Sequence, residues 1–293
     1  MIRLLIVDGH AYAYRAFHAI RELSGPSGQP VNAIYGFVKM LQKMRLALAP
    51  SHLIVVWDGG LDAGRLAAHP EYKSHRPEMP EGLRPQLDEL VHYLSAAGIA
   101  GYRGDGIEAD DYIACLARRT AAAGHEVVIA SSDKDFMQLV TPQIGLFNPN
   151  DKTGAVWSRD QVVAKTGVEP DQVVDWLALI GDAVDNIPGV PGVGPKTATE
   201  LLKQFGSAAA LLARLDEVKS EKMRSALRCS AEIVRRNLEL VRLCEVPCDY
   251  SLESLLAKPA DQDQLRGLFQ RWGFKGMLAE LEAEPMERQA ELI

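Results

Sequence analysis

Nine acidic residues stand out by position, seven of them in short clusters, and their spacing suggests a metal site. The segment Ile107–Asp111 holds three acids within four residues, which repel one another unless a proton or a cation lies between them. A single Asp-x-Asp or an acid at a helix N-terminus is common in ordinary proteins, so no cluster decides the matter alone. The whole set favours hard divalent cations bound through oxygen: Asp8, Asp58, Glu108, Asp110, Asp111, Asp133, Asp135, Asp182 and Asp185.

The absence of His and Cys from these clusters argues against zinc and favours Mg²⁺ or Mn²⁺. Two such ions about 3.5–4 Å apart can activate a water molecule and stabilise both the attacking and the leaving oxygen of a phosphodiester. Carboxylates that do not touch an ion can orient its water ligands. The acids therefore predict phosphodiester chemistry that depends on two divalent ions.

Short apolar runs place several of these acids at the ends of predicted strands. Residues 3–7, 53–57 and 126–130 read as strands, and they end at Asp8, at Asp58 and at the Ser131–Asp133 turn. Ligands of open α/β sheets bind beyond the carboxyl ends of the strands, so we expect these acids in one crevice. The alternation of strands and helices over the first 150 residues predicts an α/β fold, a mostly parallel central sheet flanked by helices.

The connection after Asp58 is long, rich in Gly and Pro, and basic. It contains Arg65, Lys73, Arg76 and Arg84 and shows no clear apolar period up to about residue 90. A connection of this length is often a functional lid. A solvated surface insertion is the alternative.

The segment Asn186–Ala198 contains the most specific local motif. Gly192 and Gly194 allow a tight hairpin that approaches another surface closely, and Pro195 suits the first turn of a helix that ends at Gly206. Such a turn, reinforced by Lys196, forms a phosphate site without sequence preference. A plain turn between helices is the alternative, but valines beside the glycines favour a helix-hairpin-helix DNA-binding element.

Composition narrows the function classes further. The 293 residues have a net charge of -7, and residues 105–185 contain 14 acidic against 6 basic residues, a concentration suited to binding cations. No apolar run approaches the ~20 residues of a membrane helix, and the opening apolar run reads as a strand instead of a signal peptide. The four cysteines predict neither a disulfide framework nor a zinc site. We therefore expect no membrane association and a cytoplasmic location.

Taken together, these segments resemble the 5′ nuclease family, which contains the flap endonucleases and the 5′→3′ exonuclease domain of bacterial DNA polymerase I. The resemblance extends over nearly the whole chain and includes these segments: Leu5–His10, Tyr14–Ala19, Val31–Phe37 and Tyr72–Pro77. One departure is Gly64, which precedes Arg65 where the family often has Phe. The resemblance implies a PIN-like nuclease core over residues 1–185 and a helix-hairpin-helix and C-terminal helical region over residues 186–293.

The resemblance also implies roles for individual residues. The nine acids would bind two Mg²⁺ or Mn²⁺ ions, and Arg15, Lys73 and Arg76 would contact the scissile phosphate. Tyr72 would stack on a base, and residues 62–95 would form a helical arch for single-stranded 5′ ends, with Arg65 contacting DNA. The hairpin would hold duplex DNA, commonly with a K⁺ ion, through Gly192, Gly194, Lys196 and Thr197.

The resulting prediction is a structure-selective 5′→3′ exonuclease and 5′-flap endonuclease in DNA replication and repair. It would be monomeric and nucleoid-associated, would leave a 5′-phosphate and a 3′-hydroxyl, and would work with a separate polymerase and ligase or be an excised polymerase domain. One alternative is a catalytically weak DNA-junction binding protein, which predicts missing acids where none is missing. Another is a phosphohydrolase of small phosphoesters, which has no use for the glycine hairpin.

Overall fold

The computed structural model describes residues 2–149, 151 and 153–290. Six strands form a sheet in the order β3-β2-β1-β4-β5-β6, and the sheet is mostly parallel, as the sequence predicts. Strand β1 is parallel to β2, β4 is parallel to β5, and β6 is antiparallel to β5. The strands are β1 (Arg3–Asp8), β2 (His52–Trp57), β3 (Ala100–Arg103), β4 (Glu126–Ala130), β5 (Ile144–Phe147) and β6 (Val156–Trp157).

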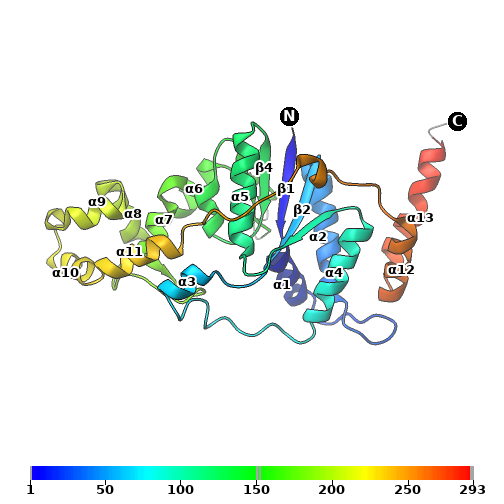
Figure 1. Cartoon of the computed structure of the whole chain (residues 1–293), viewed down its shortest axis with the longest axis horizontal. Coiled ribbons are helices and arrows are strands. Elements are labelled where there is room, and N and C mark those ends of the chain that lie inside the picture. The colour runs from blue at the N-terminus through cyan, green and yellow to red at the C-terminus, as the bar shows by residue number, and fades with distance from the viewer. Residues whose placement is uncertain (1, 150, 152, 291–293) are drawn as a thin grey trace. The chain divides into compact units, whose positions relative to one another are not determined.

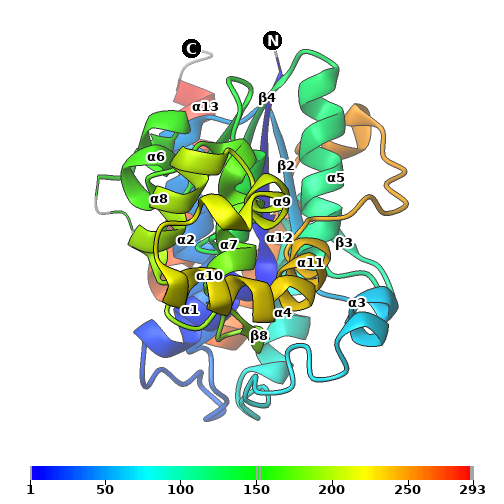
Figure 2. The ribbon, with the colours of Figure 1, turned by 90° about the vertical axis from the view of Figure 1, so that its left-hand side faces the viewer.

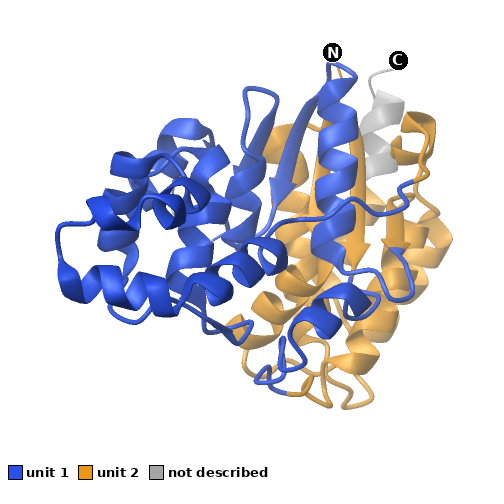
Figure 3. Ribbon diagram, turned by 60° about the vertical axis from the view of Figure 1, so that its left-hand side comes forward, with its two compact units in different colours: residues 1, 58–77, 103–248 blue, residues 2–57, 78–102, 249–293 orange. Residues whose placement is uncertain are grey.

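The chain divides into two compact units (Figure 3). Unit 1 contains residues 58–77 and 103–248, and unit 2 contains residues 2–57, 78–102 and the segment from residue 249 onward. The predicted boundary at residue 185 lies inside unit 1. The predicted division at that residue stays a prediction.

Unit 2 is built on β1 and β2, which are buried along nearly their whole length. Leu4 through Val7 are completely buried, so the strand reads as a continuous apolar run without alternation. The helices of this unit are α1 (Gly9–Ala19), α2 (Asn32–Leu48), α4 (Arg84–Ala96), α12 (Gln262–Trp272) and α13 (Lys275–Ala290). Asp8 caps α1, since its Oδ1 accepts a hydrogen bond from the Ala11 N–H at 3.0 Å.

Helix α4 includes the far end of the predicted arch and packs on α2 and α12 within unit 2. Its Gln86 is buried, and its Oε1 accepts hydrogen bonds from the first-turn amides of Ala33 and Ile34 at 2.8 and 3.2 Å. Those amides lack a side-chain cap of their own, because the preceding Val31 offers none. Of the predicted arch over residues 62–95, residue 62 and residues 69–83 lie outside helices.

Unit 1 holds strands β4 to β6 and most of the remaining helices. Figure 2 shows helices α6 to α11 gathered in one group. The helices are α3 (Ala63–Ala68), α5 (Ala109–Ala122), α6 (Arg159–Thr166), α7 (Val173–Ile180), α8 (Pro195–Phe205), α9 (Ala208–Ala213), α10 (Glu221–Cys229) and α11 (Ala231–Leu240), and a short hairpin joins β7 (Gly181–Asp182) to β8 (Ile187–Pro188). Helix α7 is buried on most sides and packs against α8 and α11, so it forms the centre of this group.

Two glycines allow the β7–β8 hairpin to close against α7. Gly181 has φ +76°, and a Cβ there would lie 2.3 Å from the Gly189 nitrogen. A Cβ on Gly189 would lie 2.2 Å from the Ile180 carbonyl oxygen. Any larger residue at either position would push the two backbones apart. These two glycines therefore fix the loop that contains Asp182 and Asp185.

Across the described residues, we find no helix with the length and hydropathy needed to cross a bilayer.

Candidate active site

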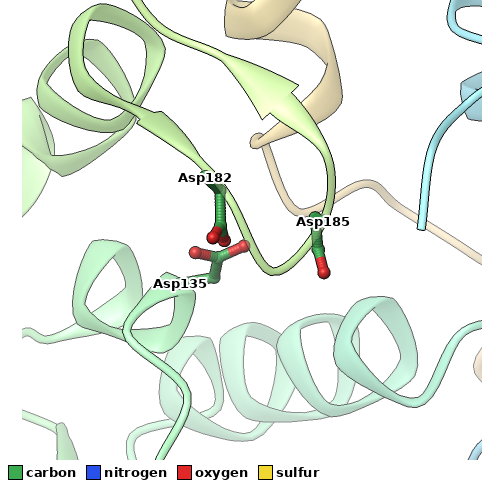
Figure 4. A group of neighbouring side chains, drawn as sticks. All are labelled: Asp135, Asp182 and Asp185. Atoms are coloured by element: carbon green, nitrogen blue, oxygen red, sulfur yellow. The ribbon is translucent and has the colours of Figure 1, made fainter. Parts of the chain in front are cut away.

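Three aspartates of unit 1 bring their carboxylates together (Figure 4). Asp135 begins a short 3-10 helix, η1 (Asp135–Leu139), while Asp182 and Asp185 lie on the β7–β8 hairpin. One carboxylate oxygen from each lies within 4.8 Å of the others. We call these residues the aspartate triad. They come from two of the motifs that the sequence marked as separate.

Local hydrogen bonds fix the backbone that holds the triad. After β4 ends at Ala130, Asp133 Oδ1 accepts the Asp135 N–H at 2.9 Å, and this bond starts η1. Buried Phe136 and Leu139 then anchor η1 in the core. On the hairpin, Asp182 Oδ1 accepts the Val184 N–H at 3.0 Å. In both places an Asp side chain stabilises the turn in which it lies.

The charge of the triad is poorly compensated at Asp135. Its Oδ1 is buried and has no hydrogen-bond partner among the described residues. Burial raises the pKa of Asp135 well above its usual range, and repulsion from Asp133, Asp182 and Asp185 adds to the rise. The pKa of Asp133 is raised as well, mainly by burial. A buried carboxylate in this environment binds either a proton or a cation.

Two basic side chains partly balance the other two members of the triad. Lys134 Nζ lies 3.1 Å from Asp182 Oδ1. Arg76 contacts Asp185 Oδ1 through Nη2 at 2.6 Å and Nε at 3.1 Å. The Arg76 side chain is still 39% exposed, so it can also meet a ligand from solvent. A cavity of about 400 Å³ opens beside Asp182.

A second acidic group lies at the start of α5 and is already compensated. Glu108 Oε2 accepts hydrogen bonds from Lys73 Nζ at 2.6 Å, Arg65 Nη1 at 3.1 Å and the Tyr72 hydroxyl at 3.1 Å. Its Oε1 accepts the Asp62 N–H at 3.1 Å. Burial by itself would raise the pKa of Glu108, but Lys73 and Arg65 outweigh it and hold that pKa below its usual range. We call Glu108 and Asp111 the α5 acids.

Lys73 connects the two acidic groups. Its ammonium contacts Glu108, while its backbone N–H donates to the Asp185 carbonyl at 3.0 Å. Lys73 adopts φ +56°, a left-handed conformation that costs a non-glycine residue free energy. Burial would lower the pKa of Lys73, but the carboxylates of Asp110 and Glu108 raise it above its usual value. The side chain is therefore a fixed positive charge at neutral pH.

Asn186 holds the same turn through hydrogen bonds. The sequence did not identify it as a site residue. It also has a positive φ, +57°, and its Nδ2 donates to the Glu71 carbonyl at 2.9 Å. Its own carbonyl lies 2.9 Å from His69 Nε2. Asn tolerates the left-handed region better than most residues, and Asn directly after Asp185 was the available signal.

Arg65 and Tyr72, which the sequence predicts to contact DNA, are both buried in the structure, and their roles in DNA binding stay predictions. Arg65 is 5% exposed, and its guanidinium donates to Asp111, Glu108 and backbone carbonyls. Tyr72 is 4% exposed, so its ring is covered and offers no stacking surface. Burial and the adjacent Glu108 raise the pKa of its hydroxyl, which donates to that carboxylate. Both side chains contact the α5 acids.

The other residues that were predicted to bind metal or phosphate are divided between the two units. Asp110 is in the first turn of α5, and Asp58 follows β2, where its Oδ1 accepts the Gly60 N–H at 3.3 Å. Both belong to unit 1, as do the triad and the α5 acids. Asp8 and Arg15 belong to unit 2. Their predicted roles at the site stay predictions.

The glycine hairpin before α8 differs from expectation in one respect. Gly192 has φ +81°, which favours glycine, but Gly194 has ordinary extended backbone and precedes α8 as its N-cap. A Cβ on either glycine would meet no other atom of the described chain. Lys196 is exposed in the first turn of α8. Gly181 and Gly189 approach other backbone atoms of the described chain closely, whereas Gly192 and Gly194 do not.

The residues present fit a divalent cation at the triad. Three carboxylates converge, and the buried oxygen of Asp135 needs a positive partner. Oxygen-only donor sets suit Mg²⁺ or Mn²⁺. The α5 acids fit direct ligation less well, because Asp111 and Glu108 already accept hydrogen bonds on both carboxylate oxygens.

Two family models match the chain. The model described as the 5′-3′ exonuclease N-terminal resolvase-like domain matches residues 3–167, and the 5′-3′ exonuclease C-terminal SAM fold matches residues 168–263. A 5′-3′ exonuclease of Aquifex aeolicus is 38% identical over 284 residues, which cover 96% of each chain.

DNA polymerase I of Bacillus caldotenax is 36% identical over 99% of this chain, but the match covers 33% of that polymerase. The chain thus spans about a third of the length of such polymerase relatives. Among solved structures, T5 5′-exonuclease with bound zinc ions aligns at a TM-score of 0.69 and 26% identity, covering 91% of this chain and 96% of that one.

Proposed function

The chain belongs to the 5′-3′ exonuclease family, whose members hydrolyse phosphodiester bonds, and we propose that it cleaves DNA at 5′ ends and 5′ flaps with divalent cations bound at the aspartate triad. The observation that supports this most directly is the buried, unpartnered Oδ1 of Asp135 between Asp182 and Asp185. Mg²⁺ or Mn²⁺ suits this donor set. A second ion would involve the remaining acids, Asp8, Asp58 and Asp110 among them.

Bound divalent cations would supply an activated water molecule and stabilise the charge that develops on the phosphate oxygens. Lys73 remains protonated, so it cannot act as a general base, and its side chain, which is 3% exposed, would act on a phosphate through its charge. Its ammonium has three donors, and Glu108 accepts one of them. Because it lies between the two acidic groups, its charge offsets the repulsion between their carboxylates and an incoming phosphate.

Arg76 has two tasks in this proposal. Its guanidinium orients Asp185 through Nε and Nη2, and its exposed part can bind a phosphate oxygen. Planar guanidinium groups suit such paired recognition better than ammonium groups do. Arg15, on α1, is proposed to contact the same phosphate by family resemblance.

Binding of duplex DNA is proposed at the start of α8. Helix α8 has 11 residues, and Lys196 lies exposed in its first turn beside Gly194. Helix N-termini present free backbone N–H groups and a partial positive charge to phosphates. Because Gly192 and Gly194 project no side chains, a DNA backbone could approach this turn closely. A K⁺ ion at this hairpin belongs to the same proposal.

A 5′-labelled flap substrate tests the proposal. We expect cleavage in Mg²⁺ or Mn²⁺, none in EDTA, and products that end in a 5′-phosphate and a 3′-hydroxyl. Asp182→Asn should lose activity, whereas Asp160→Asn, whose side chain is 82% exposed, should behave as wild type. Hydrolysis of nitrophenyl phosphate with an intact flap would instead favour a small-molecule phosphohydrolase. Flap binding without any cleavage would favour a junction-binding protein.

A further inference from the structure

Arg65 has every one of its side-chain donors in use. Nε donates to the Leu240 carbonyl at 3.1 Å, and Nη2 donates to the Arg242 carbonyl at 3.0 Å. The same guanidinium binds Asp111 in a bidentate manner, at 2.6 and 2.8 Å, and reaches Glu108 at 3.1 Å. A guanidinium has five N–H groups, and these contacts account for all five.

The partners of Arg65 come from separate segments of unit 1. Arg65 lies on α3, and the two carboxylates lie at the start of α5. The Leu240 carbonyl belongs to the last residue of α11, and the Arg242 carbonyl follows that helix. We call residues 240–248 the strap. Figures 1 and 3 show that this segment passes alongside α5. One side chain therefore joins three segments that are distant in sequence.

The strap is bound along one face of α5. Asp111 Oδ1 accepts the Cys244 N–H at 2.7 Å, and Cys115 Sγ donates to the Val246 carbonyl at 3.4 Å. Arg118 donates to the Leu243 carbonyl at 3.1 Å, and Arg119 donates to the Cys248 carbonyl. These α5 residues are three or four positions apart and so share a face of the helix. The strap is thus held in register with α5 from its first turn onward.

We propose that Arg65 is a positioning residue that holds the first turn of α5, and therefore Glu108 and Asp110, at the distance from Lys73 that cleavage requires. This positioning role adds detail to the proposed nuclease function and rests on it. Arg65 does not face solvent, so it acts on the reaction through the carboxylates it binds. Asp111, whose oxygens accept from Arg65 and Cys244, is the link in this arrangement and not a direct metal ligand.

The geometry requires arginine at this position. Lysine would keep the positive charge but could not bind Asp111 in a bidentate manner while donating to two carbonyls. A buried ion pair adds little net stability over an apolar replacement, so stability alone is a weak reason for this cluster. Fixed orientation of reactive groups is worth more, because a displacement of about 1 Å can cost about 10²-fold in rate.

The test compares Arg65→Lys with Arg159→Lys. Arg159 also donates to a carboxylate, Glu169, through two nitrogens, but its side chain is 61% exposed and lies outside the site. We expect Arg65→Lys to lower kcat on a 5′ flap about 10²-fold with KM within about threefold. Arg159→Lys should leave both unchanged. Combining Arg65→Lys with Asp111→Asn should lower kcat no further than the worse single variant, because both break the same link.

Hydrogen exchange provides a readout that does not depend on activity. In the wild-type protein, the Cys244 amide, which donates to Asp111, should be protected as strongly as the amides in the middle of α5, and Arg65→Lys should speed exchange across residues 240–248. Loss of thermal stability with unchanged kcat would overturn the proposal, as would a freely exchanging strap in the wild type. If the wild type cut no flap, the proposed function would fail, while the exchange experiment would still decide whether Arg65 holds the strap.

Discussion

The two acidic groups of unit 1 contain the same kinds of side chain in opposite electrostatic situations. At the start of α5, Glu108 is surrounded by Lys73, Arg65 and Tyr72, and its pKa is lowered. In the triad, Asp135 has an unpartnered buried oxygen and a raised pKa. Burial acts to raise the pKa of both Glu108 and Asp135, so burial cannot explain the difference. The neighbouring charges explain it: the α5 acids already have their cations, and the triad requires one.

This difference assigns different tasks to residues that look alike in the sequence. A carboxylate whose oxygens are fully bonded has a fixed orientation, so it can position its neighbours. A carboxylate pressed against other carboxylates raises the affinity of the site for a cation, because a bound cation relieves the repulsion. Substitutions in the two groups should therefore have different effects on cleavage, metal binding and stability.

The largest effect is expected for Asp135→Asn. Removing this charge takes away the carboxylate that most needs a cation, so kcat should fall at least about 10³-fold, in line with several kcal/mol of lost charge stabilisation. Binding of a flap in EDTA should persist, because less negative charge repels the phosphates. Single-turnover cleavage and a binding titration measure the two effects. Near wild-type cleavage in Mg²⁺ would show that the triad is not the metal site.

Lys73→Ala should come next, with kcat reduced about 10²-fold and affinity changed by no more than a few fold. Lys73 lies between the two groups, so its benefit should be greatest when charge develops in the transition state. Removing Lys73 would also leave Arg65 as the remaining buried cationic partner of Glu108. Steady-state kinetics on the flap separate kcat from KM. An effect restricted to affinity would make Lys73 a phosphate anchor only.

The pH dependence of stability should differ in sign between the two groups. Asp133 and Asp135 have raised pKa values, so their favourable contribution is present at low pH and is lost as pH rises through those values. Glu108 has a lowered pKa, so its contribution is present above its unfolded value of about 4.3 and is lost below it.

In EDTA, the melting temperature should therefore rise as pH falls from 8 to 5, by about 2–4 °C for each kcal/mol gained. Asp135→Asn should already be more stable than wild type at pH 8 and should show a flatter profile. Thermal unfolding followed by circular dichroism measures both. Mn²⁺ should stabilise the wild type and not the variant. A variant that is less stable than wild type at pH 8 in EDTA would contradict the raised pKa.

The smallest effect is expected for Tyr72→Phe. The substitution removes one hydrogen bond to Glu108, worth about 0.5–1.5 kcal/mol, and keeps the aromatic ring. Because Glu108 retains Lys73 and Arg65, kcat should fall less than about tenfold with DNA affinity unchanged. Tyr72→Ala should cost mainly stability, since it leaves a cavity. A loss of single-strand affinity in Tyr72→Ala, measured at a temperature where the variant is folded, would support the predicted base-stacking role.

Much of the fold could be predicted from the local pattern of apolar and turn-forming residues. The predicted strands 3–7, 53–57 and 126–130 match β1, β2 and β4 within a residue, and the helix from Pro195 ends before Gly206 as expected. Long apolar runs and turn residues act over a few positions, so the sequence shows them directly. Strands β3, β5 and β6 have two to four residues, too few for a periodic signal. The sequence did not predict helix α4, because the Gly and Pro residues before it are typical of a loop.

The sequence by itself determined which side chains could bind a cation. It supplied acids in clusters after predicted strands and at the start of a predicted helix, without His or Cys. Only the tertiary structure decided which acids compete for a cation and which are satisfied by the chain. Arg65 and Tyr72 look like surface residues of a basic loop, but contacts with residues more than 30 positions away bury them on the α5 acids. Burial and charge compensation depend on such distant contacts, which no local pattern contains.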